Sequence, residues 1–287
     1  MTQAFDIVIV GGGIVGVSIA YHLVTETDKS VILLERDQLT SGTTWHAAGL
    51  VAEVRATPNL TRLAKYTASL YDHLQEQGDG LGYRRCGALT LAMNEDRAFE
   101  VKKLAAMARA QDIDCEWLPS EAILERWPYL SGTDLVGGIY MPKDGMTNPV
   151  DTTQALARAA RAAGATIKEQ QTVEKLLTAD GRIAGVVVND DEVLADQVVL
   201  AAGLWTRDLG LSVGADFPLY PAEHFYAVSE PTDLPDDMPV LRYPDDGIYI
   251  KPDAGGRILV GCLNGMPSLW IQARYRLISL LVSSPSI

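Results

Sequence analysis

Cysteine is scarce in this chain: only Cys86, Cys115 and Cys262 occur among its 287 residues. They are widely separated, include no Cys-x-x-Cys pair and are odd in number. A disulfide framework of the kind that staples small secreted domains is therefore excluded. We predict a reducing compartment, the cytoplasm, and no metal site.

Basic residues are also few, with 24 Lys and Arg against 37 Asp and Glu and a formal net charge of -13 at pH 7. A surface that binds nucleic acid needs clustered positive charge, so we predict no nucleic-acid partner. Glycines or charges interrupt every apolar stretch before 18 residues, and the first six residues lack a basic segment. We therefore expect neither a membrane span nor a secretory signal.

Glycine is plentiful, and three glycines form a motif near the N-terminus. The apolar run at 6–10 predicts a parallel strand buried on both faces. It leads into Gly11-x-Gly13-x-x-Gly16, then into a helical pattern, and a second apolar run at 31–34 ends in Glu35. This order predicts the β-α-β unit of a dinucleotide-binding fold.

Each residue of the motif has a physical task. Gly11 permits the tight turn, Gly13 lets the backbone approach a pyrophosphate, and Gly16 lets helix and strand pack closely. The helix N-terminus offers oriented N–H groups to the phosphates. A carboxylate at Glu35 accepts hydrogen bonds from both ribose hydroxyls and repels a 2′-phosphate, which disfavours NADP.

FAD and NAD share this half-site, and a later run favours FAD. Residues 196–205 read as a strand that ends in a turn of small residues, Ala202 and Gly203, followed by Trp205. Such a turn brings backbone close to a nucleotide bound by the first unit. A core strand that simply stops at a glycine is the alternative.

The rest of the chain alternates between helical and strand patterns. Helices are expected at 58–77 and 95–111, with a third that has Asp151 as its N-cap and ends at Gly164. A hairpin turn is expected at 180–181. Strands are expected at 83–93, 165–169, 172–178, 183–189, 192–201, 217–229 and 247–261.

A run of small residues, Ser41-Gly-Thr-Thr-Trp-His-Ala-Ala-Gly-Leu50, closely follows the second strand. By itself it predicts a loop near the dinucleotide with one histidine, and a lone histidine is commonly structural. The chain from 5 to about 261 nevertheless resembles the FAD-dependent amine oxidoreductases that include dimethylglycine dehydrogenase and sarcosine dehydrogenase, in the D-amino-acid-oxidase-like superfamily. Besides this loop, residues 9–16, 33–36, 144–149 and 201–205 carry the resemblance.

The resemblance implies an α/β fold in which a Rossmann-like, three-layer ββα domain is interleaved with an α+β domain. We assign 1–82 and 145–210 to the FAD-binding domain. Residues 83–144 and 211–261 are assigned to a substrate-binding domain with a mainly antiparallel sheet.

The resemblance also implies site residues. The family histidine that matches His46 is joined covalently to the 8α-methyl group of the flavin. A His–Tyr pair over the flavin is matched by His224 and Tyr249, with ordinary strand residues that have a buried polar tip as the alternative. Arg55 or Lys251 is a candidate for the substrate carboxylate, with a structural charge as the alternative. The predicted cofactor-binding residues are Gly11, Gly13, Ile14, Val15, Gly16, Glu35, Arg36, Ser41, Gly42, Thr43, Thr44, His46, Ala48, Gly49, Leu50, Val173 (whose backbone would meet the adenine), Ala202, Gly203 and Trp205.

The activity that the resemblance implies is oxidative demethylation of an N-methyl amino acid, of the dimethylglycine or sarcosine type, by hydride transfer to flavin N5. Another flavin amine or amino-acid oxidase of the same fold is an alternative, and a non-catalytic, flavoprotein-like regulatory subunit is a second. The electron acceptor (a flavoprotein, a quinone or oxygen) stays open. Tetrahydrofolate is expected as a partner only of a longer parent protein.

The resemblance ends near Gly261, where relatives continue into further strands. Residues 262–287 match nothing in the family, so we expect a truncated or frameshifted reading frame there. A parallel sheet that lacks a central strand exposes unpaired backbone groups. We therefore expect that the chain binds FAD weakly, aggregates or is inactive.

Overall fold

The computed structural model describes residues 3–78, 80–130 and 134–262, and the chain divides into two compact units. The first unit contains Met1–Gly49, His73–Gly82 and Thr147–Ala222. The second contains Leu50–Asp72, Tyr83–Met146 and the chain from Glu223 onward. Residues 50–72, which we had predicted to be part of the FAD-binding domain, thus belong to the second unit.

The first unit is built on a six-stranded sheet of order β8-β2-β1-β11-β10-β9. Its strands are β1 (Gln3–Val10), β2 (Val31–Leu34), β8 (Thr166–Lys168), β9 (Val173–Ala179), β10 (Arg182–Val188) and β11 (Asp191–Leu200). The first three and β11 are parallel neighbours, whereas β9 and β10 form an antiparallel hairpin next to β11. Positive φ angles at Asp180 and Gly181, 51° and 76°, turn this hairpin, as predicted.

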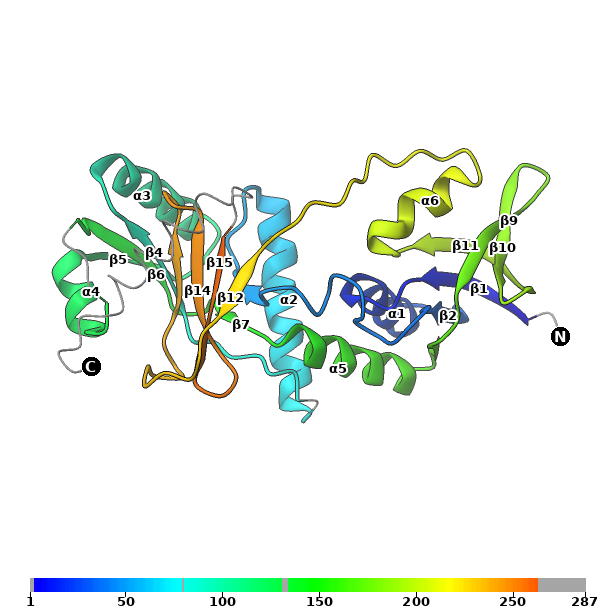
Figure 1. Cartoon of the computed structure of the whole chain (residues 1–287), viewed down its shortest axis with the longest axis horizontal. Coiled ribbons are helices and arrows are strands. Elements are labelled where there is room, and N and C mark those ends of the chain that lie inside the picture. The colour runs from blue at the N-terminus through cyan, green and yellow to red at the C-terminus, as the bar shows by residue number, and fades with distance from the viewer. Residues whose placement is uncertain (1–2, 79, 131–133, 263–287) are drawn as a thin grey trace. The chain divides into compact units, whose positions relative to one another are not determined.

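Three layers make up this unit (Figure 1). On one face of the parallel strands, Val8, Val10, Ile32 and Leu34 pack against side chains of the β9–β10 hairpin, among them Val186. Helices α1 (Ile14–Glu26) and α5 (Pro149–Ala162) pack against each other and against β1, β2 and β8. The predicted three-layer ββα architecture is therefore confirmed.

Helix α5 begins three residues earlier than predicted. Asn148 is its N-cap, with a side-chain oxygen that accepts from the backbone N–H groups of Val150 and Asp151. Pro149 follows at the first helical position, which a proline suits because its missing N–H leaves nothing unpaired. Asp151, predicted as the cap, instead lies in the first turn, and the chain turns at Gly164 with a φ of 107°.

The second unit is built on a seven-stranded sheet of order β12-β15-β14-β13-β4-β6-β5. Its strands are β4 (Ala88–Ala92), β5 (Glu116–Pro119), β6 (Gly137–Met141), β12 (Tyr226–Val228), β13 (Val240–Tyr243), β14 (Ile248–Asp253) and β15 (Arg257–Cys262). All neighbours are antiparallel except β13 and β4, which confirms the mainly antiparallel sheet.

Helices cover this sheet on both faces. Helix α3 (Glu95–Arg109) packs Val101 and Ala105 against Ile139 of β6. Helix α4 (Ser120–Arg126) places Ile123 in a second cluster with Leu241 and other residues of β4, β13, β14 and β15. Helix α2 (Pro58–Glu76) matches the helix predicted at 58–77 to within one residue. The short strand β3 (Leu50–Val51) pairs with β7 (Gly145–Met146). None of the helices in the described ranges is long and apolar enough to cross a membrane.

Several strand predictions were too long. The region 83–93 forms a strand only at Ala88–Ala92, and 217–229 only at Tyr226–Val228. Phe217 and Tyr220 are exposed, so the apolar residues that suggested a strand are not core residues. Cys262, predicted to begin an atypical tail, is the last residue of β15 and pairs with Ile248. The rest of that prediction concerns residues 263–287, which lie outside the described ranges.

Candidate functional site

The glycine-rich turn between β1 and α1 is closely packed against the end of β11. Gly11 has a φ of 112°, and a Cβ atom there would overlap the carbonyl oxygen of Ala201. A Cβ at Gly16 would overlap the carbonyl oxygen of Gly11. A side chain at either position would therefore force the backbone to shift, and the turn brings the backbone of β1, α1 and β11 together.

The N-terminus of α1 is open to a ligand. Gly13 is its N-cap and supplies no side-chain cap, and the first turn contains no acidic residue. The buried Thr44 side chain accepts a hydrogen bond from Ile14 N at 3.0 Å, which ties the 41–50 loop to the start of the helix. The remaining N–H groups and the positive end of the helix dipole favour an anion here.

Glu35 stands at the end of β2, beside the glycine-rich turn. Its Oε2 accepts from Gly12 N at 2.6 Å and its Oε1 accepts from Asp37 N at 2.9 Å. A carboxylate has about four lone-pair positions, so two remain for further donors. A ribose with two vicinal hydroxyls supplies that pair of donors.

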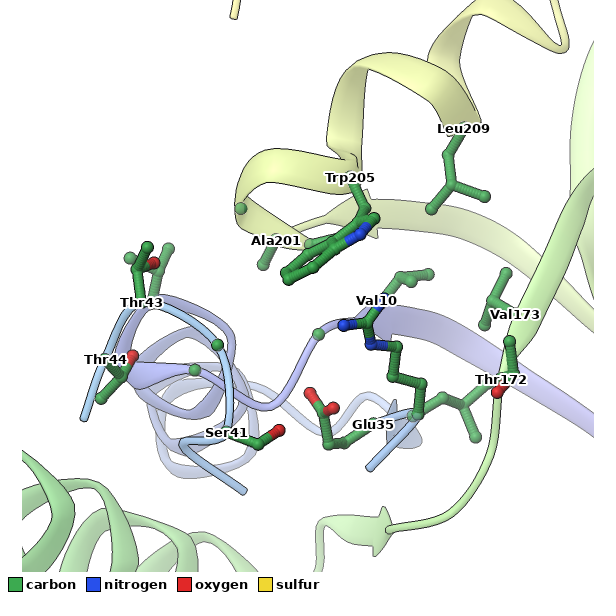
Figure 2. A pocket seen from close by; sticks show the side chains of 18 of the residues that line it. Val10, Glu35, Ser41, Thr43, Thr44, Thr172, Val173, Ala201, Trp205 and Leu209 are labelled. Atoms are coloured by element: carbon green, nitrogen blue, oxygen red, sulfur yellow. The ribbon is translucent and has the colours of Figure 1, made fainter. Parts of the chain in front are cut away.

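A cavity of about 630 Å³ opens over this turn, and all of its walls belong to the first unit. Figure 2 shows Trp205 and Leu209 on one side of it, with Glu35 and Ser41 on the other. The predicted residues that line it are Gly11, Gly13, Ile14, Val15, Glu35, Arg36, Ser41, Gly42, Thr43, Thr44, Val173, Ala202, Gly203 and Trp205.

One wall of the cavity carries a stacked pair. The Arg36 guanidinium carbon lies 3.7 Å from the centroid of the Trp205 ring. Arg36 also pairs with Asp37, with Nε and Oδ2 3.0 Å apart. A planar cation on an aromatic ring is a stabilising contact, and here it links the end of β2 to the residues that follow β11.

Ten wall residues are absent from the predicted set, among them Gln171 and Thr172 before β9, and Leu209 and Ser212 at and after α6 (Thr206–Leu211). The loop residues are polar and match no motif. Leu209 recurs four residues after Trp205, and this helical spacing is the signal that could have found it.

Five predicted cofactor residues do not line the cavity: Gly16, His46, Ala48, Gly49 and Leu50. Gly16 acts through packing, and Gly49, with a φ of 70°, is held against the Thr147 carbonyl. His46 is exposed, and its ring stacks on Trp45 with centroids 3.7 Å apart. In the sequence it lies between two lining residues, Thr44 and Ala47, and it is not itself one of the lining residues.

The residues of the first unit fit an FAD molecule. The glycine-rich turn and open helix end suit a pyrophosphate, the carboxylate of Glu35 suits a ribose, and the cavity is of the size that binds cofactors. Val173 lines the same cavity, and its contact with the adenine stays a prediction.

The second unit carries both predicted catalytic residues: Tyr249 lies in the interior strand β14, and His224 lies just before the edge strand β12. Tyr249 of β14 pairs with Gly261 of β15, which in turn pairs with Tyr226 of β12. A Cβ at Gly261 would overlap the Tyr249 ring, so this ring lies across the glycine. Burial raises the pKa of the Tyr249 hydroxyl, with smaller contributions from Tyr226 and Cys262, and the group stays protonated at neutral pH.

His224 and the two predicted carboxylate binders differ in their surroundings. His224 is exposed, and within the described ranges no hydrogen bond joins it to Tyr249, so the His–Tyr pair stays a prediction. Lys251 is 5% exposed, and its Nζ lies 3.2 Å from Asp253 Oδ1. Arg55 is exposed.

Comparison with known proteins finds relatives that are named as an oxidase, a dehydrogenase and a regulatory subunit. The 4-methylaminobutanoate oxidase (formaldehyde-forming) of Paenarthrobacter nicotinovorans is 40% identical over 265 residues, which cover 91% of this chain and 32% of the relative. Human mitochondrial dimethylglycine dehydrogenase is 34% identical over 272 residues, 93% of this chain and 31% of the relative. The mouse mitochondrial pyruvate dehydrogenase phosphatase regulatory subunit is 34% identical over 256 residues, which cover 88% of this chain and 29% of the relative. The chain spans about a third of the length of these relatives.

Solved structures agree on the fold. L-proline dehydrogenase from P. horikoshii superimposes with a TM-score of 0.88 at 21% identity, over 98% of this chain and 78% of that one. The profile of the FAD dependent oxidoreductase (DAO) family matches residues 6–265. The chain therefore belongs to this family of FAD-dependent oxidoreductases.

Proposed function

We propose that this chain forms the cofactor-binding and substrate-binding part of an enzyme that oxidises an N-methyl amino acid with FAD. The observation that carries the proposal is the cavity over the glycine-rich turn, with Glu35 and Trp205 in its walls. The names of two relatives, a methylaminobutanoate oxidase and a dimethylglycine dehydrogenase, support the substrate class.

The residues of the first unit would hold the cofactor by its polar parts. The N-terminus of α1 binds the pyrophosphate, Glu35 the adenosine ribose, and the backbone near Val173 the adenine. When bound, FAD supplies a hydride acceptor at N5 for the N-methyl carbon of the substrate. Orientation of cofactor and substrate is the contribution of the protein.

His46 is the proposed point of covalent attachment. Two observations support this proposal: the ring of His46 is exposed, and the neighbouring Thr44, which lines the cavity, is tied to the start of α1 by its hydrogen bond from Ile14 N. A covalent bond would keep the cofactor in place even if other contacts were weak. The test is acid precipitation: flavin that stays in the protein pellet, with a mass increase of one FAD that His46→Ala abolishes, supports the attachment. Unmodified mass would reject it.

The amine must react as its free base, because a protonated nitrogen has no lone pair to assist hydride loss. Burial raises the pKa of the Tyr249 hydroxyl, so this group is neutral at neutral pH. Tyr249 would therefore position the amine by hydrogen bonding and would not act as a phenolate. His224 is the proposed acceptor of the ammonium proton.

Turnover tests the proposal. The purified chain is incubated with 4-methylaminobutanoate, dimethylglycine and sarcosine in the presence of an artificial electron acceptor, and formaldehyde is measured. Formaldehyde from at least one of them, and none from the matching primary amine, supports the proposal. Peroxide in place of reduced acceptor would identify an oxidase. Tetrahydrofolate coupling and a cytoplasmic location stay predictions for the whole protein.

A regulatory role is the second candidate, because one relative at 34% identity is named as a regulatory subunit. The presence of His46 in its Thr-Trp-His-Ala-Ala-Gly context argues against it, since a regulator has no need of a covalent flavin. Bound FAD without reduction by any N-methyl amine would favour this candidate.

A further inference from the structure

A row of polar residues crosses the sheet of the second unit. Tyr226, Gly261, Tyr249 and Arg242 are directly paired on β12, β15, β14 and β13, and Arg242 is paired with Thr90 of β4. Residues that pair directly share one face of a sheet. The row therefore places a cation on the strand next to the tyrosine that the proposed function uses, and the ring of this tyrosine extends over Gly261 of β15.

Arg242 is the unusual member of this row. It is half-buried, yet its guanidinium makes no salt bridge or hydrogen bond with another residue in the described ranges. Burial lowers the pKa of this group, while the charge of Asp144 raises it and that of Arg55 lowers it. A partly buried guanidinium without a direct partner is unfavourable unless a ligand supplies one.

The carboxylates of this unit do not supply that partner. Glu53 and Asp72 are both held by Arg85, at 3.3 Å and 2.6 Å. Asp144 is 1% exposed; its Oδ1 accepts from Glu53 N at 2.9 Å, and its Oδ2 has no hydrogen-bond partner. Asp144 therefore stabilises the charge of Arg242 only through a longer-range Coulombic interaction, and it interacts in the same way with Arg55.

The two earlier candidates for carboxylate binding are weaker. Lys251 is balanced by Asp253 within hydrogen-bond distance, and exposed Arg55 acts through solvent, which screens its charge. A guanidinium also binds a carboxylate through two parallel hydrogen bonds, which an ammonium group does not do.

We propose that Arg242 binds the carboxylate of the substrate, and that Tyr249 and Tyr226 place hydroxyl groups along the same row. This inference rests on the proposed function and deepens it: the substrate is an amino acid with a free carboxylate, and N-methyl amines that lack one are poor ligands. Arg242 is thus a specificity-determining residue.

The test measures binding and does not depend on flavin chemistry. Calorimetry compares methoxyacetate, a carboxylate without an oxidisable amine, with its uncharged methyl ester. The variants are Arg242→Gln and, as a matched control on the same sheet, Arg257→Gln, whose Nη1 donates to Ser229 O at 3.2 Å. A charge-assisted pair of hydrogen bonds corresponds to a loss of about tenfold to a hundredfold in affinity.

The expected result is that Arg242→Gln loses this affinity for methoxyacetate, while the ester binds unchanged and Arg257→Gln behaves as the unmodified chain. Equal binding of methoxyacetate by Arg242→Gln, or no preference of the unmodified chain for the carboxylate over the ester, would overturn the inference. If Arg242→Gln does not fold, Arg242→Met decides: it keeps an apolar stem but no charge, so an unchanged preference for the carboxylate in that variant overturns the inference too. If carboxylate binding depends on Arg242 but no N-methyl amino acid reduces the flavin, the proposed function fails and the binding site stands.

Discussion

Gly16→Ala is the substitution whose effect the structure defines most sharply. Gly16 lies in the first turn of α1, and a Cβ there would come closer than 3.0 Å to the carbonyl oxygen of Gly11 and to 3.4 Å from the Ala201 Cβ. The obstacle is backbone, which cannot rotate away as a side chain does. The helix must therefore move away from the ends of β1 and β11.

The magnitude follows from two opposing contributions. Forcing an extra carbon into a packed core destabilises by about 1–3 kcal/mol, and backbone overlap places this case near the upper value. Alanine in place of glycine within a helix returns about 1 kcal/mol. The net loss is about 2 kcal/mol, which corresponds to a melting temperature lower by about 4–8 °C for a chain of this size.

The assay is thermal unfolding followed by circular dichroism, with Gly42→Ala as the control. The nearest atom to a Cβ at Gly42 is Trp205 Cζ3 at 3.7 Å, an ordinary contact, so that variant should stay within about 0.5 kcal/mol of the unmodified chain. Gly16→Ala should also bind FAD more weakly, because the turn that faces the pyrophosphate moves. A melting temperature for Gly16→Ala equal to that of the control would refute this reasoning.

Three further predictions concern the first unit. Asn148→Ala should lower the free energy of unfolding in urea by about 1 kcal/mol, because α5 loses its N-cap. Asp151→Ala should cost less, since the Asp151 side chain only interacts favourably with the helix dipole. Equal losses would contradict the assignment of the cap. Hydrogen bonds from Ser30 and the Lys29 charge lower the pKa of Asp6 from 3.8 to about 2, so its contribution is present above pH 3.8 and is lost as the pH falls through 2. The stability advantage over Asp6→Asn should therefore shrink across that range, and a constant difference would reject it. Trp205→Ala should weaken FAD binding about tenfold in fluorescence titration, because the cavity loses a wall and the Arg36 stack, whereas Leu204→Ala, which lines no part of the cavity, should not.

The parts of the fold that the sequence predicted well depend on local patterns. Examples are the glycine motif, the apolar runs of β1 and β2, and the turn at Asp180. In each case the residue types within a few positions of one another are enough to determine the local structure. Asn148 was missed as a cap because Asp151 is equally suited to the role by residue type, and only the position of Pro149 distinguishes them.

Elements whose formation depends on distant partners were not predicted. Strand β13 (Val240–Tyr243) is four residues long and is defined by its pairing with β4 and β14. Helix α4 is only seven residues long, about two turns, and the burial of Ile123 holds it in place. Arg242 escaped notice for the same reason: its register with Tyr249 exists only in the folded sheet.

The measurement that tests the central claim most directly is the anaerobic spectrum of the FAD-loaded chain on mixing with an N-methyl amino acid. The account predicts that the flavin absorbance near 450 nm bleaches with 4-methylaminobutanoate, dimethylglycine or sarcosine, and that the fully demethylated amino acids, 4-aminobutanoate and glycine, leave it unchanged. A flavin that stays fully oxidised with every one of these amines, in protein that binds FAD and unfolds cooperatively, would contradict the account.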